Sequence, residues 1–158
     1  MDPIDYYLGV LADKTGALVA TAARYGAMFG GGSPETVEVL RVYGERLGMA
    51  FQLADDIIDI ASDGSASGKT PGTDLREGVD TLAVLFAKAS TDPADARLQA
   101  LLRSDLTDDD LHGEALALLR AHPAVERARA HTRDVGAQAL DALAGLAASD
   151  AKAALAAL

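Results

Sequence analysis

The sequence predicts an all-α protein. Its long segments carry apolar residues at helical spacing or have a helix-favouring composition, and none alternates apolar and polar residues as a half-buried strand does. Of the 158 residues, 49% are hydrophobic and only 4% aromatic, so we expect a core of Ala, Leu, Val and Ile. The length suits one moderate core, and we expect a single domain over residues 1–158, without a linker or an internal repeat.

The first two helices are expected to be the longest. Asp2 can cap the first helix, and the proline after it fits a first turn, so this helix should run to about Phe29. The run GGGSP interrupts it, and Ser33 followed by proline can open a second helix that reaches about Ala61.

A loop rich in Gly and Ser is then expected over residues 62–73, followed by shorter helices. Their expected ranges are 80–89, 95–103, 107–121, a longer helix from Pro123, and 150–157. In the run TDDDLHGE the acids fall in a first helical turn, where the helix dipole favours them, with Thr107 as a possible cap. We therefore assign these acids to capping.

Charge and composition exclude several classes of function. A net charge of −10 argues against a nucleic-acid backbone or an anionic membrane surface as the main partner. The chain has no cysteine, which excludes disulfides and thiolate metal sites and fits a reducing cytosol, so we expect a cytoplasmic location. No apolar run approaches the roughly 20 residues of a membrane span, and MDPIDYY is not a signal peptide.

The first helix is apolar around nearly its whole circumference, so we expect it to be buried on all sides. Its apolar positions are Leu8, Val10, Leu11, Ala12, Leu18, Val19 and Ala23. Lys14 nevertheless shares a face with several of them. Two readings stay open: a lysine that extends to solvent along an apolar surface, or a cation held in a cavity for an anion.

The second helix carries a stripe of acids that we call the acidic stripe. On a helical wheel its polar residues fall within an arc of about 100°, and apolar residues fill most of the rest. These polar residues are Gln52, Asp55, Asp56, Asp59 and Asp63. Like charges four residues apart cost roughly 0.2–0.5 kcal/mol per pair, and no Lys or Arg on this face relieves them.

Two readings of the acidic stripe are possible. Solvated helix faces usually mix both charge signs, whereas a stripe of one sign favours a site whose countercharge arrives from outside. Oxygen ligands on a rigid helix suit Mg²⁺, which one or two carboxylates hold together with substrate phosphates. A general Mg²⁺/Ca²⁺-binding module is less well supported, because no loop has calcium-ligand spacing.

The run GSASGKT that follows resembles a nucleotide-binding phosphate loop. It is one residue short between its glycines, it follows a helix where a strand is required, and it runs into Pro71. We therefore reject an NTPase, and keep Lys69 as a candidate to bind phosphate.

Three blocks of the chain resemble the trans-isoprenyl diphosphate synthases, or polyprenyl synthetases. They are KTGALVATAARYGAM (14–28), GMAFQLADDIIDI (48–60) and GKTPGTDLREGVDTL (68–82), and their order and spacing match as well. The middle block is similar to the family's second aspartate-rich motif, DDxxD. The resemblance covers about residues 2–86. Related terpene cyclases usually carry Asn or Asp, then Ser or Thr, then Glu here, so Asp59 and Asp63 favour an elongating synthase.

The resemblance implies Mg²⁺-dependent condensation of isopentenyl diphosphate with an allylic prenyl diphosphate in a helical bundle. Asp55, Asp56 and Asp59 would hold Mg²⁺ against the allylic diphosphate, with Asp55 as the main ligand. Lys14 and Lys69 would bind that diphosphate. The family pattern adds Thr15 and Gln52 as pocket residues and Asp74 as a further one. On this view the countercharge of the acidic stripe is Mg²⁺-pyrophosphate.

One departure from the family affects the function. The first aspartate-rich motif and the residues for isopentenyl diphosphate should precede Lys14, but only 13 residues do so and none of them match. We therefore expect the C-terminal half of a synthase, acting as a homo-oligomer or in a complex with a chain that bears the first motif. The alternative is a non-catalytic partner that regulates a full-length synthase. In this family the length of the prenyl product depends largely on residues near the first motif, so this sequence does not predict it.

Overall fold

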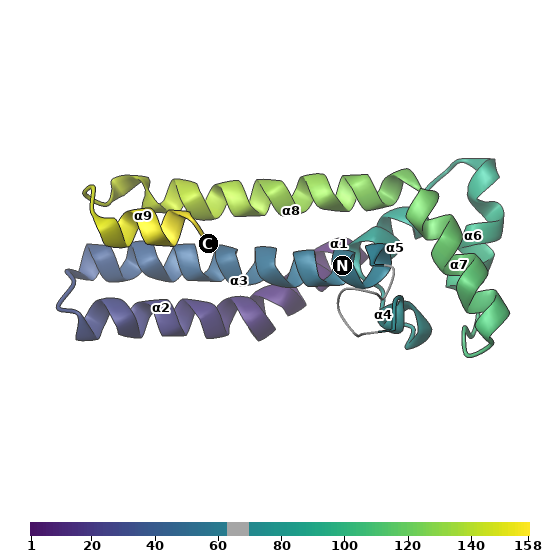
Figure 1. Cartoon of the computed structure of the whole chain (residues 1–158), viewed down its shortest axis with the longest axis horizontal. Coiled ribbons are helices and arrows are strands. Elements are labelled where there is room, and N and C mark those ends of the chain that lie inside the picture. The colour runs from purple at the N-terminus through teal and green to yellow at the C-terminus, as the bar shows by residue number, and fades with distance from the viewer. Residues whose placement is uncertain (63–69) are drawn as a thin grey trace. The chain divides into compact units, whose positions relative to one another are not determined.

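The computed structural model describes residues 1–62 and 70–158, and within these ranges every regular element is a helix, which confirms the all-α prediction. The element between α1 and α2 is a short π-helix, and η2 and η3 are 3₁₀ turns. In chain order the elements are α1 (Pro3–Leu11), η1 (Ala12–Gly16), α2 (Ala17–Phe29), α3 (Pro34–Ala61), α4 (Thr73–Arg76), α5 (Leu82–Lys88), η2 (Pro93–Asp95), α6 (Ala96–Leu102), α7 (Asp109–Ala121), α8 (Pro123–Ala142), η3 (Leu143–Gly145) and α9 (Asp150–Ala156) (Figure 1).

The chain divides into two compact units, and each is described by itself. The first unit comprises Met1–Tyr7 and Leu53–His131, and the second comprises Leu8–Gln52 and Thr132–Leu158. The single domain expected over residues 1–158 stays a prediction. None of the helices within the described ranges is both long and apolar enough to cross a membrane.

Side-chain caps begin the helices largely where the sequence predicts them. Asp2 Oδ1 accepts the backbone N–H of Ile4 at 2.7 Å, and Ser33 Oγ accepts that of Thr36 at 3.2 Å. The cap of α7 was predicted wrongly. Asp108, not Thr107, accepts the N–H groups of Asp110 and Leu111, both at 3.0 Å. A carboxylate accepts such bonds as readily as a hydroxyl and also complements the helix dipole.

The first helix differs from expectation in two ways. The π-helix η1 interrupts it at Ala12–Gly16, a local change of period that hydrophobic spacing does not reveal. The prediction that it is buried on all sides is wrong for this chain, because six of its large apolar side chains are exposed. The most exposed are Phe29 (89%), Leu18 (71%) and Tyr6 (63%), and the others are Tyr25, Met28 and Val10. Lys14 is exposed as well.

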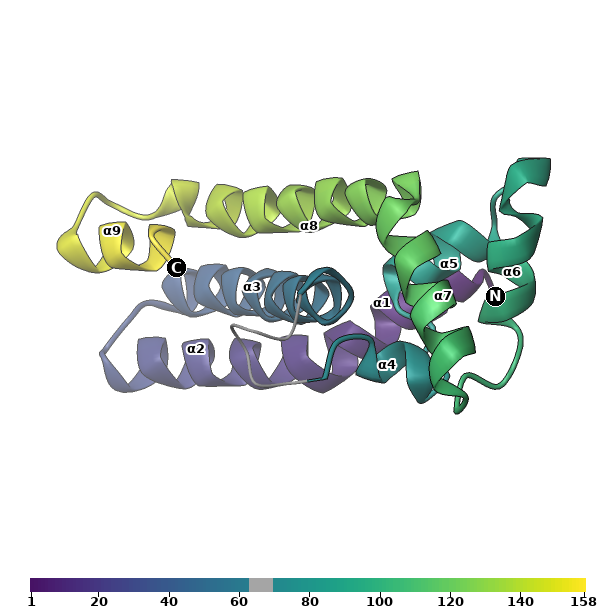
Figure 2. The same ribbon diagram turned by 45° about the vertical axis from the view of Figure 1, so that its right-hand side comes forward.

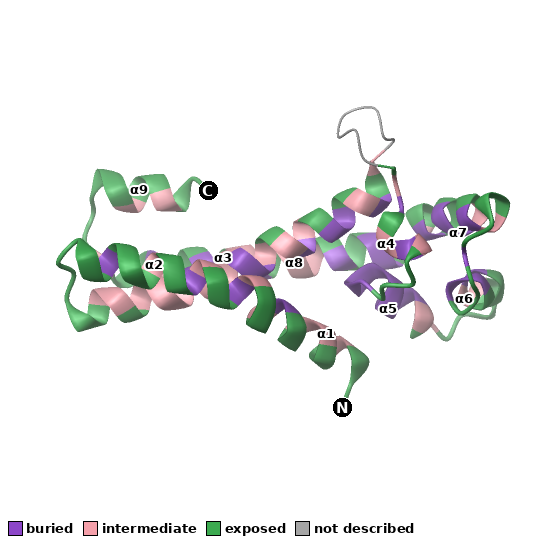
Figure 3. Cartoon of the chain, turned by 90° about the horizontal axis from the view of Figure 1, so that it is seen from below, coloured by how far each residue is buried: buried purple, intermediate pink, exposed green. Residues whose placement is uncertain are grey.

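In the first unit, α5 forms the centre of the core. Six consecutive residues, Leu82–Ala87, are buried, so this helix contacts protein on every side (Figure 3). α6 and α7 pack side by side, and α5 contacts both of them (Figures 1 and 2). Leu119 of α7 is completely buried. A helix that is apolar all round has no solvent-facing side, which explains why α5 carries no amphipathic pattern.

In the second unit, the core includes Tyr43 of α3 and Ala139 and Leu143 from the C-terminal segment. Tyr43 donates its hydroxyl to the backbone carbonyl of Leu155 at 2.6 Å and so ties the last helix, α9, to α3. Ser149 caps α9 by accepting the N–H of Lys152 at 3.1 Å. These contacts place the C-terminal helix against the same core as α3.

Two glycines let α3 approach the preceding helical segment closely in the second unit. A Cβ on Gly48 would lie 2.8 Å from the carbonyl oxygen of Thr15 and 3.0 Å from the Cα of Gly16. A Cβ on Gly44 would lie 2.8 Å from the carbonyl oxygen of Val19. The obstructing atoms are backbone, so they move only if the helices separate.

We expect Gly48→Ala to lower the free energy of unfolding by about 1–3 kcal/mol, the usual cost of overpacking. Gly26→Ala is the matched control, because Gly26 also lies inside a helix but a Cβ there meets nothing within 4 Å. It should raise the free energy of unfolding by about 0.5–1 kcal/mol through the lower backbone entropy of the unfolded chain. Urea denaturation measures both. Changes of the same sign would contradict the close approach.

Candidate functional site

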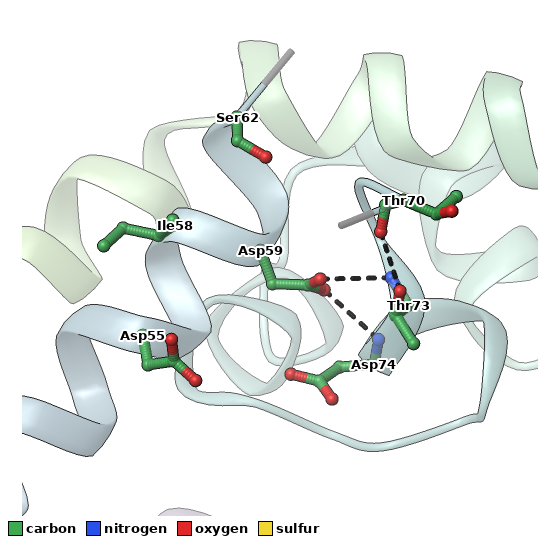
Figure 4. Close-up of a pocket in the computed structure, with 7 residues that line it drawn as sticks. All are labelled: Asp55, Ile58, Asp59, Ser62, Thr70, Thr73 and Asp74. Atoms are coloured by element: carbon green, nitrogen blue, oxygen red, sulfur yellow. Dashed lines mark hydrogen bonds between the residues drawn. The ribbon is translucent and has the colours of Figure 1, made fainter. Parts of the chain in front are cut away.

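The end of α3 and the start of α4 line a pocket in the first unit that we call the acidic pocket. Its volume is about 370 Å³. The carboxyl groups of Asp55, Asp59 and Asp74 lie around one opening (Figure 4). The remaining lining residues in the described ranges are Ile58, Ser62, Thr70 and Thr73. The structure thus brings together two acids of the acidic stripe and the more distant Asp74.

The helical period determines which stripe residues reach the pocket. Asp55 and Asp59 are four residues apart on α3 and share one face. Asp55 is exposed and Asp59 is partly exposed, so both carboxylates are open to a ligand from solvent. The neighbouring Ile58 is 54% exposed, which leaves an apolar wall beside the acids.

Asp59 also organises the segment opposite α3. Its Oδ1 accepts the backbone N–H of Thr73 and its Oδ2 accepts that of Asp74, both at 3.2 Å. Its backbone carbonyl accepts the N–H of Gly72 at 2.9 Å. A carboxylate from α3 thereby caps the four-residue helix α4. The loop predicted over residues 62–73 included Thr73, the first residue of this helix. This cap positions Asp74 at the pocket.

α7 holds the other side of the same turn, through residues that sequence reasoning missed. The buried His112 donates from Nε2 to the carbonyl oxygen of Gly72 at 2.8 Å. Gly72 has φ +72°, a backbone conformation that favours glycine. A Cβ at this position would also lie only 2.8 Å from His112 Nε2, so the close approach requires glycine as well. Arg76 forms an ion pair with Asp109 at 2.9 Å. The signal in the sequence was a histidine on an otherwise apolar helix face.

Arg120, also on α7, binds the C-terminal end of α3. Its Nε donates to the carbonyl oxygen of Ile60 at 2.7 Å, and its Nη2 donates to that of Ser62. The final carbonyls of a helix lack partners within the helix, and a cation complements the helix dipole there. The last turn of α3, which carries Asp59 of the acidic stripe, is therefore fixed by a second helix.

Asp56 differs from the other acids of the stripe. It is 8% exposed, it does not line the acidic pocket, and Tyr7 donates its hydroxyl to Asp56 Oδ2. Burial, together with the hydrogen bond to Asp56 and its charge, raises the pKa of Tyr7. The phenol therefore stays protonated and remains a donor. The adjacent acids Asp55 and Asp56 thus have different surroundings.

The electrostatics of the pocket suit a cation. Burial raises the pKa of Asp74, and the negative charges of Asp59, Asp56, Glu77 and Asp55 raise it further. A positive ion would relieve this repulsion. The described residues contain no group of three or more His, Cys, Asp or Glu side chains that could hold a metal ion by themselves. Asp55 and Asp59, which line the pocket, are carboxylates of the type that hold Mg²⁺ together with water and phosphate oxygens.

The remaining predicted site residues divide between the second unit and the undescribed segment. In the second unit, Thr15 donates its hydroxyl to Gln52 Oε1 at 3.3 Å, so these two predicted pocket residues do meet. Lys14 is exposed on η1. Lys69 and Asp63 lie outside the described residues.

Comparisons with known proteins agree on one family. The sequence model of the family described as Polyprenyl synthetase matches residues 2–119. Nonaprenyl diphosphate synthase of Mycobacterium tuberculosis is 49% identical over all of this chain and 47% of its own length. A short chain isoprenyl diphosphate synthase of Methanothermobacter thermautotrophicus is 39% identical over 95% of this chain and 46% of its own length. The chain therefore spans about half the length of these relatives.

Solved structures give the same result. Geranylgeranyl pyrophosphate synthase from Corynebacterium glutamicum, complexed with calcium and isoprenyl diphosphate, superposes with a TM-score of 0.90 at 39% identity. The match covers 99% of this chain and 49% of that one. The two proteins are therefore alike in sequence as well as in fold.

Proposed function

Because the chain belongs to the polyprenyl synthetase family, we propose that it contributes the second aspartate-rich half of a site for Mg²⁺-dependent prenyl transfer. The reaction would condense isopentenyl diphosphate with an allylic prenyl diphosphate to give a longer polyprenyl diphosphate. The observation that carries the proposal is the acidic pocket, in which Asp55, Asp59 and Asp74 gather within the matched region. We also propose a cytoplasmic location, based on the chain's composition.

Each predicted residue has a role in this proposal. Asp55 and Asp59 would hold Mg²⁺ from the pocket wall, with Asp56 behind them as a third negative charge. Lys14 and Lys69 would bind the allylic diphosphate, and Thr15 and Gln52 would line its pocket. Asp74 would complete the acidic rim. The similar synthase from Corynebacterium glutamicum is complexed with calcium and isoprenyl diphosphate, which supports a site for a divalent ion and a diphosphate.

The chemistry of the proposed reaction explains why carboxylates, Mg²⁺ and lysines would act together. The allylic C–O bond breaks with its electron pair on pyrophosphate, the double bond of isopentenyl diphosphate forms the new C–C bond, and a proton is lost. Mg²⁺ would neutralise the departing pyrophosphate, a preorganised electrostatic stabilisation. Asp55 and Asp59 would orient the ion, and the two lysines would add positive charge. Ile58 beside them would exclude water from part of the pocket.

An exposed apolar surface makes a partner part of the proposal. The exposed large side chains of α2 form a surface that an additional helical segment could cover. We therefore propose a homo-oligomer or a complex with a chain that bears the first aspartate motif. The same surface supports the second candidate, a non-catalytic partner of a full-length synthase.

Isothermal titration calorimetry tests the proposed site directly. We expect this chain to bind Mg²⁺ weakly alone and pyrophosphate weakly alone, and each more tightly in the presence of the other. The enhancement must be the same in both directions, because coupling between two ligands is reciprocal. Equal pyrophosphate affinity with and without Mg²⁺ would reject a site built for the metal–diphosphate pair.

A further inference from the structure

Tyr7 and Asp56 form a contact that the proposed function does not use. Successive helix residues differ in direction by about 100°, so Asp55 and Asp56 lie at opposite edges of the acidic stripe. Asp55 lines the pocket, whereas Asp56 is 8% exposed and accepts the Tyr7 hydroxyl at Oδ2. The O–H group of Tyr7 is therefore directed at the Asp56 carboxylate.

A buried carboxylate needs such a donor. Removing a charge from water is unfavourable unless hydrogen bonds replace the lost solvation, and a bond to a charged group is among the stronger ones. The Asp56 charge also lies close to the pocket, because Asp56 is next to Asp55 and three residues before Asp59 on α3, and both of those acids line the pocket. Asp56 can thus attract a cation in the pocket without touching it, provided that its carboxylate stays in place.

We propose that Tyr7 is a positioning residue: its hydroxyl holds the Asp56 carboxylate in the buried wall behind Asp55, where its charge strengthens cation binding in the acidic pocket. The inference rests on the proposed function only in placing the cation there. Tyr7 lies outside the DDxxD motif and outside the set of residues predicted from the sequence.

The chain provides a matched control in the adjacent tyrosine. Tyr6 is 63% exposed and lies on the same helix, α1. Tyr7→Phe and Tyr6→Phe each remove one hydroxyl at neighbouring positions, but only the first removes the donor to Asp56. Asp56→Asn removes the charge that Tyr7 is proposed to hold.

Mn²⁺ alone is the probe, with binding measured from the electron paramagnetic resonance signal of the free ion. We expect Tyr7→Phe to weaken Mn²⁺ binding by about three- to tenfold, the range that one hydrogen bond supplies. Tyr6→Phe should leave it unchanged. In an Asp56→Asn background, which itself binds more weakly, Tyr7→Phe should have no further effect. A purely structural role would not produce this dependence on Asp56, and thermal melts of each variant identify loss of fold.

The outcomes separate this inference from the proposed function. Equal Mn²⁺ affinity of Tyr7→Phe and the unmodified chain overturns the role of Tyr7, and so does an equal loss in both Asp56 backgrounds. Failure of the unmodified chain to bind Mn²⁺ overturns it as well. If Tyr7→Phe weakens Mn²⁺ binding but added pyrophosphate gives no enhancement, the positioning role stands and the metal–diphosphate function is rejected.

Discussion

Asp55→Ala should remove the Mg²⁺-dependent part of pyrophosphate binding and lower the joint affinity by about 100-fold, comparable to the larger losses known when metal sites are perturbed. Asp55 combines three properties that predict this size of effect. It is exposed, it lines the acidic pocket, and it precedes Asp59 by one helical turn. Calorimetry of pyrophosphate with and without Mg²⁺ measures the loss.

Asp110→Ala is the matched control for charge. Asp110 is an exposed acid in the first turn of α7, and its removal also reduces the net negative charge by one. It should leave pyrophosphate binding unchanged. An equal loss in both variants would show that overall charge, and not the acidic pocket, attracts the cation.

Mixing this chain with a polypeptide that carries the first aspartate motif should produce prenyl transfer where neither chain has it alone. The increase should be large, because enzymes typically accelerate their reactions by at least about 10⁶-fold and the proposed site is incomplete without both motifs. Radiolabelled isopentenyl diphosphate with farnesyl or geranylgeranyl diphosphate measures turnover. Chromatography with light scattering measures whether a complex forms.

The reconstitution has an internal control. A mixture made with the Asp55→Ala chain should form the complex but lose turnover, since the exposed face of α2 is unchanged. Condensation by the unmixed chain would contradict the need for a partner. A complex without turnover would favour the non-catalytic partner, the second candidate function.

The long helices were predictable because local rules determine them. Asp2 caps α1 and Ser33 caps α3, the helix predicted as the second, and α3 ends at Ala61 as expected. α4 was not predictable in the same way. It has four residues, and its first amides are bonded to the carboxylate of Asp59, so its existence depends on a contact 14 residues away.

The candidate site shows the same division. Asp55 and Asp59 could be placed on one face from their spacing alone, and their pocket confirms that geometry. The residues that support them could not be found in this way. Tyr7 lies 49 residues from Asp56 and Arg120 lies 60 from Ile60, so only the folded chain brings them together.

The carboxylate of Asp59 has a double use with a thermodynamic consequence. In the structure it accepts the amides of Thr73 and Asp74, and in the proposed function it also attracts Mg²⁺. A lone pair of Asp59 that binds the ion is no longer available to the amides of α4. The free energy of ion binding is therefore reduced by the free energy of the hydrogen bonds that are weakened. The order of α4 and occupation of the pocket are therefore linked functions of a single side chain. Through Asp59, binding of a cation in the acidic pocket would therefore change the stability of α4, the helix that carries Asp74.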